Sequence, residues 1–375
     1  MKKGMAIGLK KRKLIKVFIT LLLTVITLII GYIAYVLITY KRIEDNRVLE
    51  VYTKGSVDEQ PLRLNEEYTA MTYNIGFGAY SSDYSFFMDG GKYSRAYDKQ
   101  AVLDNINGSI GIIQKQDADF TLLQEVDLRA TRSYHVNQQL MIEESLSDFS
   151  SAFAVNYDSP YLMYPLWEPH GKSKAGISTV SKYQISSAVR RSIPIDTSLY
   201  KLIDLDRCYS KVKIKTEDGK YLSLYNVHLS AYTKDESIVR SQIRMLAEEM
   251  EKDREEGNYI VCGGDFNQDL LGDSSSVFGT FEIEENWAKP FPASDLRGGT
   301  AVAYDLLDEE EVKTLAPSCR NADAPYRKGI SFVTMVDGFI LSDNVELLHI
   351  ETIDNGFLYS DHNPVKLSFR LQPDS

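Results

Sequence analysis

The sequence predicts an α/β protein, a layered sandwich of strands and helices, preceded by a single membrane-spanning helix. Three observations lead to this fold class. An uncharged run fills residues 17–40, several short apolar runs stop abruptly at polar side chains as buried strands do, and two longer stretches carry apolar residues at helical spacing. The chain has 375 residues, 43% of them hydrophobic, which is enough for one large domain or two ordinary ones.

The N-terminal region has the charge pattern of a membrane anchor. Residues 1–16 hold seven Lys or Arg and no acid, and the uncharged run that follows is long enough to cross a hydrocarbon core of about 30 Å as a helix. The basic head is expected in the cytoplasm, which places residues 41–375 outside the cell. The apolar run is longer than that of a cleaved signal peptide and no small-x-small site follows it, so we expect an uncleaved signal anchor in the cell membrane.

After the anchor the chain becomes strongly acidic. Of the 42 Lys and Arg, 35 remain after residue 40, against 53 Asp and Glu, a net charge of −18. Residues 41–67 are polar and of mixed charge, and we expect a stalk there, followed by one catalytic-type domain over residues 68–371. The acidic balance counts against extended Lys and Arg contact with nucleic-acid phosphates.

Three cysteines do not suggest a disulfide framework. Cys262 lies within an expected core strand and is interpreted as a small buried apolar residue. One bridge between Cys208 and Cys319 stays open.

In the first half of the domain, strands are expected over residues 69–74 and 120–125, each ending in polar side chains. An aromatic-rich loop at 80–93 lies between them and is expected to pack against its own domain. Apolar residues at helical spacing predict a helix over Lys99–Gln116. A second helix is expected to begin near Arg129 and to run toward Leu146.

In the second half, a strand over 221–229 is apolar on both faces and should be central and covered on both sides. A capping box at 233–236 predicts the start of a helix that ends near Gly257. Residues 270–327 carry few signals and are expected to lie over the site. Further strands are expected at 259–262, at 332–341 and 345–352 as a neighbouring pair, and at 365–371.

The most informative stretch is Gly263 to Asn267. The two glycines let the backbone turn sharply after the apolar run, and Asp265 and Asn267 then follow one residue apart. If the chain is still extended there, both side chains point to the same side. A carboxylate beside an amide at a strand end suits holding a phosphate and moving its proton, although an ordinary Asx turn would look alike.

Similar polar side chains end or interrupt the other apolar runs. In a layered α/β sandwich such strand ends gather at one rim, so we expect these groups to meet there. Carboxylates with an amide can hold a hard divalent ion such as Mg²⁺, whereas the histidines are too few and too far apart for a short zinc motif. The set is Asn74, Glu125, His228, Asp265, Asn267, Asp337, Asp361 and His362.

Six short motifs together resemble the endonuclease/exonuclease/phosphatase superfamily, which includes deoxyribonuclease I-like and neutral sphingomyelinase-like enzymes. They are TYNI at 72–75, LQEV at 123–126, NVHL at 226–229, GDFN at 264–267, VDGF at 336–339 and SDHNP at 360–364. The resemblance covers about residues 68–371. It implies two β-sheets packed face to face and flanked by helices, a four-layer sandwich, and metal-dependent hydrolysis of phosphate esters by water.

The resemblance also implies a metal site. Glu125 corresponds to the main metal carboxylate of the family, helped by Asn74 and Asp361, and the expected ion is Mg²⁺, with Mn²⁺ as an alternative. Whether one or two ions bind stays open.

The same resemblance assigns the remaining roles. Asp337 corresponds to the acid that orients the histidine of an Asp-His pair, here His362, while His228 and Asn267 correspond to donors to the phosphate oxygens. Asp265 corresponds to the residue that handles a proton of the water or leaving group. Either Asp265 or His362 can then be the general base.

Three further residues follow the metal carboxylate closely. Arg132, Tyr134 and His135 can line the substrate pocket, although an ordinary helix surface explains them equally well. Deoxyribonuclease I-like members carry an extra Glu that orients the counterpart of His228. Glu168 is the available acid, but no motif surrounds it, and we do not assign it that role.

These expectations point to a membrane-anchored extracellular phosphodiesterase or phosphatase. A nuclease is one alternative, and a lipid phosphodiesterase of the phospholipase C or sphingomyelinase type is another. A non-enzymatic alternative is a tethered binding module on the same fold, which would be expected to lack Glu125 or His362. The expected partners are a phosphate-ester substrate and the membrane, and no protein partner is inferred.

Overall fold

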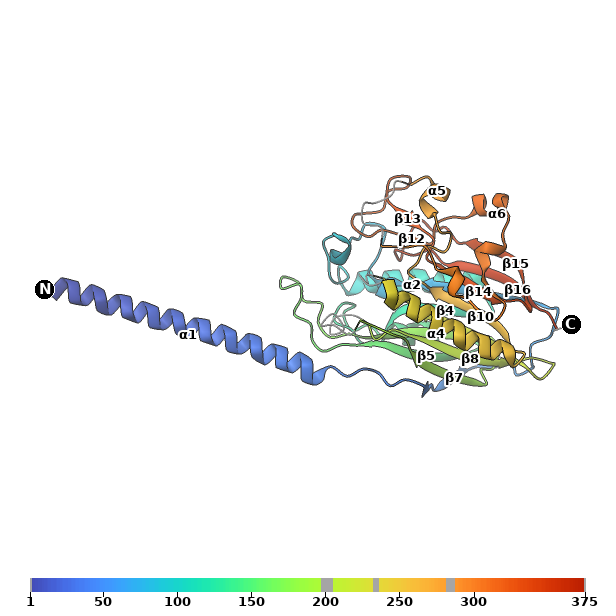
Figure 1. The fold of residues 1–375 in the computed structure, drawn as a ribbon, viewed down its shortest axis with the longest axis horizontal. Helices are drawn as coiled ribbons and strands as arrows, with labels where there is room; N and C mark the ends of the chain where they lie inside the picture. Colours follow the sequence, from blue (N-terminus) through green and yellow to red (C-terminus); the bar gives the residue numbers. More distant parts are fainter. Residues whose placement is uncertain (1, 197–204, 232–235, 281–286, 374–375) are drawn as a thin grey trace.

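A computed structural model places one long helix apart from a domain built on two seven-stranded sheets (Figure 1). It describes residues 2–196, 205–231, 236–280 and 287–373. The helix, α1 (Lys2–Thr39), contains within Lys10–Thr39 an 18-residue stretch with a mean hydropathy of 2.6, and only 6% of that stretch is buried. By length and composition α1 is therefore a candidate membrane span.

The first sheet has the order β1-β7-β8-β9-β10-β14-β11. Its centre is the parallel pair β9 and β10, and the other neighbours are antiparallel. The strands are β1 (Arg47–Val48), β7 (Ser187–Ser192), β8 (Cys208–Lys215), β9 (Tyr221–His228), β10 (Tyr259–Asp265), β14 (Asp337–Ser342) and β11 (Thr300–Val302).

The second sheet has the order β15-β16-β3-β4-β6-β5-β2. Its one parallel pair, β3 and β4, is again central. The strands are β15 (Val345–Thr352), β16 (Val365–Leu371), β3 (Glu67–Asn74), β4 (Phe120–Asp127), β6 (Lys174–Ser181), β5 (Phe149–Asp158) and β2 (Val51–Lys54). A separate two-stranded ribbon joins β12 (Cys319–Arg320) to β13 (Val333–Thr334).

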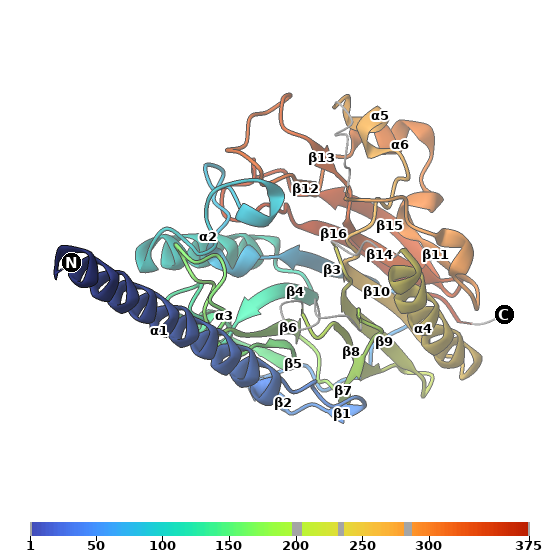
Figure 2. The same cartoon turned by 60° about the vertical axis from the view of Figure 1, so that its left-hand side comes forward.

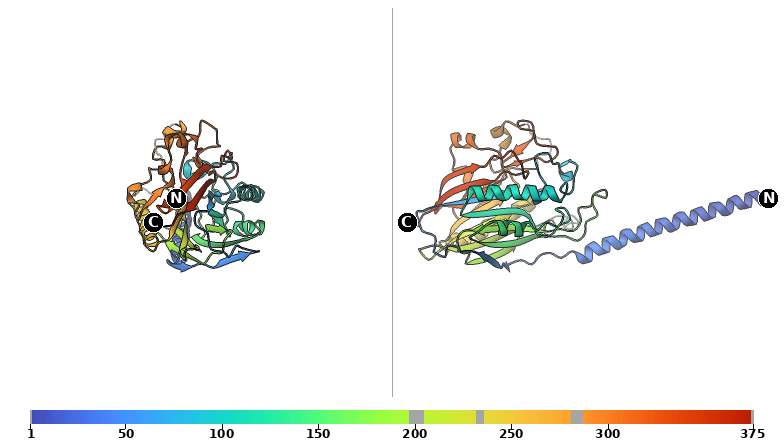
Figure 3. Two further views of the ribbon diagram at one scale, coloured as in Figure 1. Left: turned by 90° about the vertical axis from the view of Figure 1, so that its right-hand side faces the viewer. Right: turned by 180° about the vertical axis from the view of Figure 1, so that it is seen from behind.

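The two sheets pack face to face, and helices cover their outer faces. Strands β3 and β4 contact β10 across the interface, while α4 (Glu236–Glu255) lies on β10 from the other side. The helices α2 (Lys99–Gln116) and α3 (Gln138–Ser145) cover the second sheet, as Figures 2 and 3 show. The short helices α5 (Ser274–Phe278) and α6 (Glu309–Thr314) lie at one side. This four-layer sandwich confirms the predicted fold class.

Local chemistry explains why α2 begins and ends where the sequence predicts. The side chain of Asp98 accepts a hydrogen bond from the backbone N of Ala101 and so caps the first turn. At the other end Asp117 adopts a left-handed conformation, with φ of 47°, and its N–H bonds to Ile113 O. The buried residues Val102, Ile106 and Ile113 share one face.

A buried amide links the two sheets beneath the strand ends. Gln124 Nε2 on β4 donates to Asn226 Oδ1 on β9 at 2.8 Å, and Asn226 Nδ2 donates to Ser178 O at 2.9 Å. Both amide side chains are fully buried, so these bonds satisfy groups that would otherwise be costly. They fix the relative position of the two sheets close to the site.

Residues 41–67 belong to the folded domain, which corrects the expected stalk. This segment supplies an edge strand to each sheet, β1 beside β7 and β2 beside β5. Leu62 is fully buried within the core. Near the start of the segment, the guanidinium of Arg42 donates to Asp206 Oδ1 at 3.1 Å and to Ile193 O at 2.7 Å. The helix α1 is therefore joined to the domain by a short connection that is hydrogen-bonded to it.

Three other local expectations are corrected. Residues 129–137 form turns, and α3 begins only at Gln138. The strands β14 and β15 follow each other but lie in different sheets, because the chain crosses between sheets at Asp343 and Asn344. The segment 270–327 covers the site only in part, since β11 joins the far edge of the first sheet. The expected capping box at 233–236 begins outside the described residues.

Candidate active site

The site forms where the central strands of both sheets end. Asp265, the last residue of β10, is in register with His228 on β9 and with Asp337 on β14. From the opposite sheet, Asn74 at the end of β3 donates from Nδ2 to Asp265 Oδ2 at 2.9 Å. Residues from three other strands thus lie around the Asp265 carboxylate.

Asp337 and His362 form a buried hydrogen-bonded pair. His362 Nδ1 lies 2.7 Å from Asp337 Oδ2, and its other ring nitrogen, Nε2, lies 3.9 Å from Asp265 Oδ2 and 3.6 Å from Cys319 Sγ. Burial alone would lower the pKa of His362, but the Asp337 carboxylate, followed by Cys319 and Asp265, raises it well above 6.5. The imidazole ring of His362 therefore tends to carry a proton on the side that faces Asp265.

His228 and Asn267 complete the surroundings of Asp265. His228 Nε2 lies 3.5 Å from Asp265 Oδ2, and the backbone N of Asn267 donates to Asp265 Oδ1 at 2.9 Å. Burial raises the pKa of Asp265 above 3.8, and burial lowers the pKa of His228 well below 6.5, with the nearby charges of Arg207 and His362 acting in the same direction. His228 is thus a neutral imidazole beside a carboxylate that takes up protons more readily than usual.

No side chain orients the second ring nitrogen of His228. Within the described part of the chain, Nδ1 has no hydrogen-bond partner. Glu168, the acid left unassigned by the sequence, accepts bonds from Ser94 N at 2.7 Å and Ser94 Oγ at 3.0 Å instead.

Glu125 and Asp361 make a second acidic group at the same rim. The ladder between β4 and β6 shifts register between Leu123 and Val126, and Glu125 has a φ of 54°. Such a bulge re-aims a side chain. Burial raises the pKa of Asp361 to about 6, the negative charge of Glu125 adding to the rise while His362 and Arg320 oppose it. Two carboxylates close enough to interact are the oxygen donors that a hard cation needs.

The buried residues also contain a tighter cluster. One ligand atom from each of Asp265, Asp337 and His362 lies within 4.8 Å of the others. In this cluster His362 Nδ1 is already hydrogen-bonded to Asp337 Oδ2, so these two atoms are engaged with each other and not open to a metal ion.

A cavity of about 270 Å³ opens onto these groups. Of the eight residues expected from the sequence, the six that line it are Glu125, His228, Asp265, Asn267, Asp361 and His362. Asn74 and Asp337 lie behind this wall, bonded to Asp265 and His362. The structure thus places six of the eight on the wall of one cavity and the other two directly behind it.

Arg132 carries the positive charge nearest to Glu125. Its guanidinium binds Asp127 through two bonds, Nη2 to Oδ1 at 2.9 Å and Nε to Oδ2 at 3.2 Å, and lies 3.8 Å from Glu125 Oε2. It also stacks 3.9 Å above the ring of Phe77. Burial lowers the pKa of Arg132, but Asp127 and Glu125 raise it by more, so the side chain stays cationic in the cavity wall.

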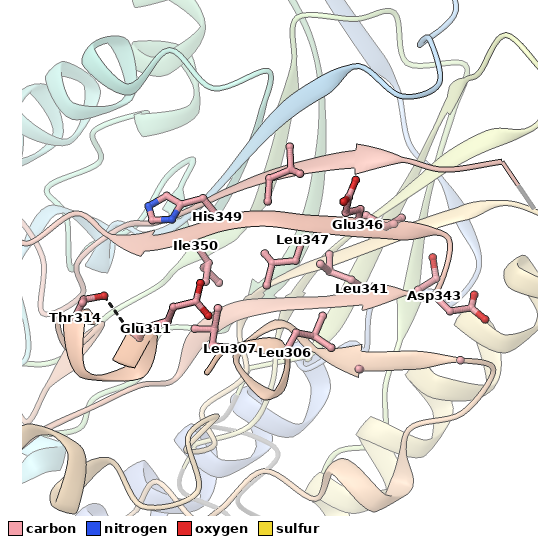
Figure 4. A pocket seen from close by; sticks show the side chains of 15 residues that line it. Leu306, Leu307, Glu311, Thr314, Leu341, Asp343, Glu346, Leu347, His349 and Ile350 are labelled. Atoms are coloured by element: carbon pink, nitrogen blue, oxygen red, sulfur yellow. Dashed lines mark hydrogen bonds between the residues drawn. The ribbon is translucent and has the colours of Figure 1, made fainter. Parts of the chain in front are cut away.

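A second cavity, of about 460 Å³, is larger but chemically different. Figure 4 shows it beside β14 and β15, lined by Leu306, Leu307, Leu341, Leu347 and His349 among others. Among the described residues, none of the eight expected from the sequence lines it. The smaller cavity is therefore the candidate active site.

The sequence of this chain matches the model of the endonuclease/exonuclease/phosphatase family over residues 71–318. The chain belongs to this family. No curated protein matches it. The family assignment confirms the resemblance inferred from the six motifs and supports hydrolysis of phosphate esters as the activity.

Solved structures of the family share the fold at low sequence identity. An endonuclease/exonuclease/phosphatase from Beutenbergia cavernae is 14% identical with a TM-score of 0.57, covering 82% of this chain and 72% of that one. A second, from Bacteroides vulgatus, is 14% identical with a TM-score of 0.52 over 82% of this chain and 100% of that one. ANGEL2, a 2′,3′-cyclic phosphatase bound to adenosine-2′,3′-vanadate, is 16% identical with a TM-score of 0.53 over 86% and 99%.

The cavity rim comes from loops and from the short strand β12, and this is where sequence reasoning found least. Arg132 lines the cavity, whereas Tyr134 and His135 do not: Tyr134 points its hydroxyl to Tyr97 O at 3.1 Å, and His135 is exposed. Sequence reasoning missed the rim residues Arg207, Trp287, Cys319 and Arg320. They follow no apolar run that ends at the site, so no pattern marks them.

Proposed function

We propose that this protein is a membrane-anchored, metal-dependent phosphoesterase whose domain acts outside the cell. The observation that carries the proposal is the set of contacts around Asp265, which joins Asn74, His228 and the Asp337–His362 pair in and directly behind the wall of one cavity. The uncharged run of α1, with its basic head, supports the anchor and its orientation.

The donor set fits a hard divalent ion. Glu125 and Asp361 offer carboxylate oxygens on the cavity wall. Asn74 Oδ1 accepts one bond, from Gly76 N at 3.0 Å, and a carbonyl oxygen has a second lone pair. These three residues would hold Mg²⁺ or Mn²⁺. Such an ion supplies a Lewis acid that offsets charge on the phosphate oxygens.

The remaining residues handle the phosphate and the protons. His228 and the amide of Asn267 face the cavity as donors for the non-bridging oxygens of the phosphate. Asn267 Nδ2 also donates to Leu229 O at 2.9 Å, which fixes the orientation of this amide. Asp265, or His362 in its deprotonated form, accepts the proton of the attacking water, and Asp337 binds His362 Nδ1 and so leaves Nε2 as the ring nitrogen that takes the proton. Donors fixed in a buried site stabilise charge that develops during the attack without having to reorganise.

The test uses the full chain in vesicles with bis(p-nitrophenyl) phosphate as substrate. We expect nitrophenol release that requires added Mg²⁺ or Mn²⁺, stops with a chelator, and is abolished by His362→Ala in protein whose circular dichroism is unchanged. A folded chain that gives no turnover with either ion would leave the tethered binding module as the function. Plasmid DNA, RNA, phosphatidylcholine and sphingomyelin, compared in one preparation, separate the nuclease from the lipid phosphodiesterase.

A further inference from the structure

The loop between β5 and β6 exposes a run of large apolar side chains. Tyr161, Met163, Tyr164, Leu166 and Trp167 are all exposed, Leu166 by 77% and Trp167 by 76%. Five such side chains within seven residues are unusual on a surface that faces only water, and they mark a contact with a partner or a membrane.

The same loop is bonded to the candidate membrane helix. The hydroxyl of Tyr32 on α1 accepts a bond from Met163 N at 2.9 Å and donates to Tyr161 O at 3.2 Å. The hydroxyl of Tyr35, one turn further, accepts from Tyr161 N at 3.2 Å. Figures 1 and 3 show the loop, in green, extending from the domain on the side of α1.

The depth of these tyrosines can be placed from the helix itself. Lys16 is the last charge before the uncharged run, and about 20 helical residues cross the hydrocarbon core, which ends the core near residue 36. Tyr32 and Tyr35 then lie in the last turns within the membrane, where aromatic rings gather at the lipid–water boundary. The backbone at Tyr161 and Met163 shares that depth.

We propose that the segment 161–167 inserts into the lipid–water interface beside α1 and that the substrate is a phosphate ester in the headgroup of a membrane lipid. This inference rests on the proposed anchor and hydrolase. The net charge of −18 after residue 40 opposes an anionic surface, so the expected surface is zwitterionic.

The link to the substrate comes from the cavity rim. Tyr157 and His170 flank the loop on either side and both line the active-site cavity. The ring of Tyr164 lies 5.7 Å from that of Phe87, whose neighbours Phe86 and Met88 also line the cavity. The segment 161–167 and the cavity rim therefore pack together, and insertion of this segment brings the cavity to the lipid headgroups.

Fluorescence tests the insertion without relying on activity. The chain has two tryptophans, so Trp287→Phe leaves Trp167 as the only one. With the full chain anchored in phosphatidylcholine vesicles, we expect lipids brominated close to the headgroup to quench its emission about twofold or more, as for a side chain at the interface. Trp167→Phe, which keeps Trp287 in the cavity, is the matched control and should be quenched far less. Equal emission with and without bromine would overturn the insertion.

Kinetics test the substrate. The double variant Leu166→Ser/Trp167→Ser should hydrolyse phosphatidylcholine and sphingomyelin in vesicles about tenfold more slowly or worse, with an unchanged rate on bis(p-nitrophenyl) phosphate, because only the lipid route needs the inserted loop. Val277→Ser/Leu306→Ser, at positions exposed by 38% and 52%, is the control and should change neither rate.

Each failure is distinguishable. A wild-type chain that hydrolyses neither substrate refutes the proposed hydrolase, while the quenching result still decides the insertion. A chain that hydrolyses the soluble ester but no vesicle lipid, or a double variant that loses both activities equally, overturns the lipid substrate alone.

Discussion

Replacing Asp337 by Asn removes one charge from the active site and almost no volume. The amide oxygen can still accept the bond from His362 Nδ1, which is 2.7 Å long in the native pair. We therefore expect the fold and substrate binding to persist, while His362 loses the carboxylate that makes it more basic. The expected result is a fall in kcat with little change in KM.

The size of the fall follows from the distance. Two unit charges 2.7 Å apart interact by about 6 kcal/mol at an effective dielectric constant of about 20. The charge centres lie further apart than the bonded atoms, and the neutral hydrogen bond remains, so we take about 4 kcal/mol as lost. At about 1.4 kcal/mol for each factor of ten, kcat should fall about a thousandfold.

The assay is metal-saturated hydrolysis of bis(p-nitrophenyl) phosphate by the full chain, with thermal unfolding as the check on folding. Asp265→Asn is measured beside it. If Asp265 is the base, its variant should lose much more activity than Asp337→Asn, whereas similar losses identify His362. A folded Asp337→Asn variant with kcat within about threefold of the wild type, under about 0.7 kcal/mol in the barrier, would refute the role given to the pair.

Three other substitutions test the metal site and the supporting contacts. Glu125→Gln keeps the shape but removes the charge of the main proposed ligand, so the Mg²⁺ concentration for half-maximal activity should rise by about tenfold or more, and an unchanged metal titration would contradict the assignment. Arg132→Met leaves the buried Asp127 carboxylate without its bidentate partner and should cost about 3–5 kcal/mol in urea unfolding, most of which Asp127→Asn in the same chain should restore. Burial alone would raise the pKa of Asp253, but Tyr225, Lys211 and Lys213 hold it below 3.8. Because a depressed carboxylate pKa stabilises the fold above the unfolded value, Asp253→Asn should cost about 1–3 kcal/mol at pH 7, and the difference should vanish as pH falls through the folded pKa.

Much of the sandwich is readable from the sequence because each central strand is an apolar run that stops at a polar residue. The runs before Asn74, Asp265 and His228 become β3, β10 and β9, and α2 has the predicted bounds. Parallel neighbours end on the same side, which is why side chains chosen only as strand ends meet in space.

The wrong predictions of secondary structure and strand pairing have a common physical origin at the edges of the two sheets. The strands β1 and β2 are only two and four residues long and half of their residues are polar, so nothing distinguished them from a stalk. The pairing of β14 and β15 was also wrong, because a two-residue connection that is typical of a hairpin instead carries the chain from one sheet to the other. Edge pairing depends on partners distant in sequence, which local patterns do not report.

Two neighbouring residues of the motif at 123–126 have different roles: Gln124 links the two sheets, and Glu125 lines the cavity. Gln124 faces the sheet interface and bonds Asn226, so it must point inward. Its neighbour Glu125 would then point to the outer face if the strand continued regularly. The bulge between Leu123 and Val126, with its positive φ at Glu125, breaks that alternation and turns the carboxylate into the cavity. The strain of about 1–3 kcal/mol that a non-glycine residue incurs in this conformation is thus a condition for placing the proposed metal carboxylate directly after the amide that locks the sheets.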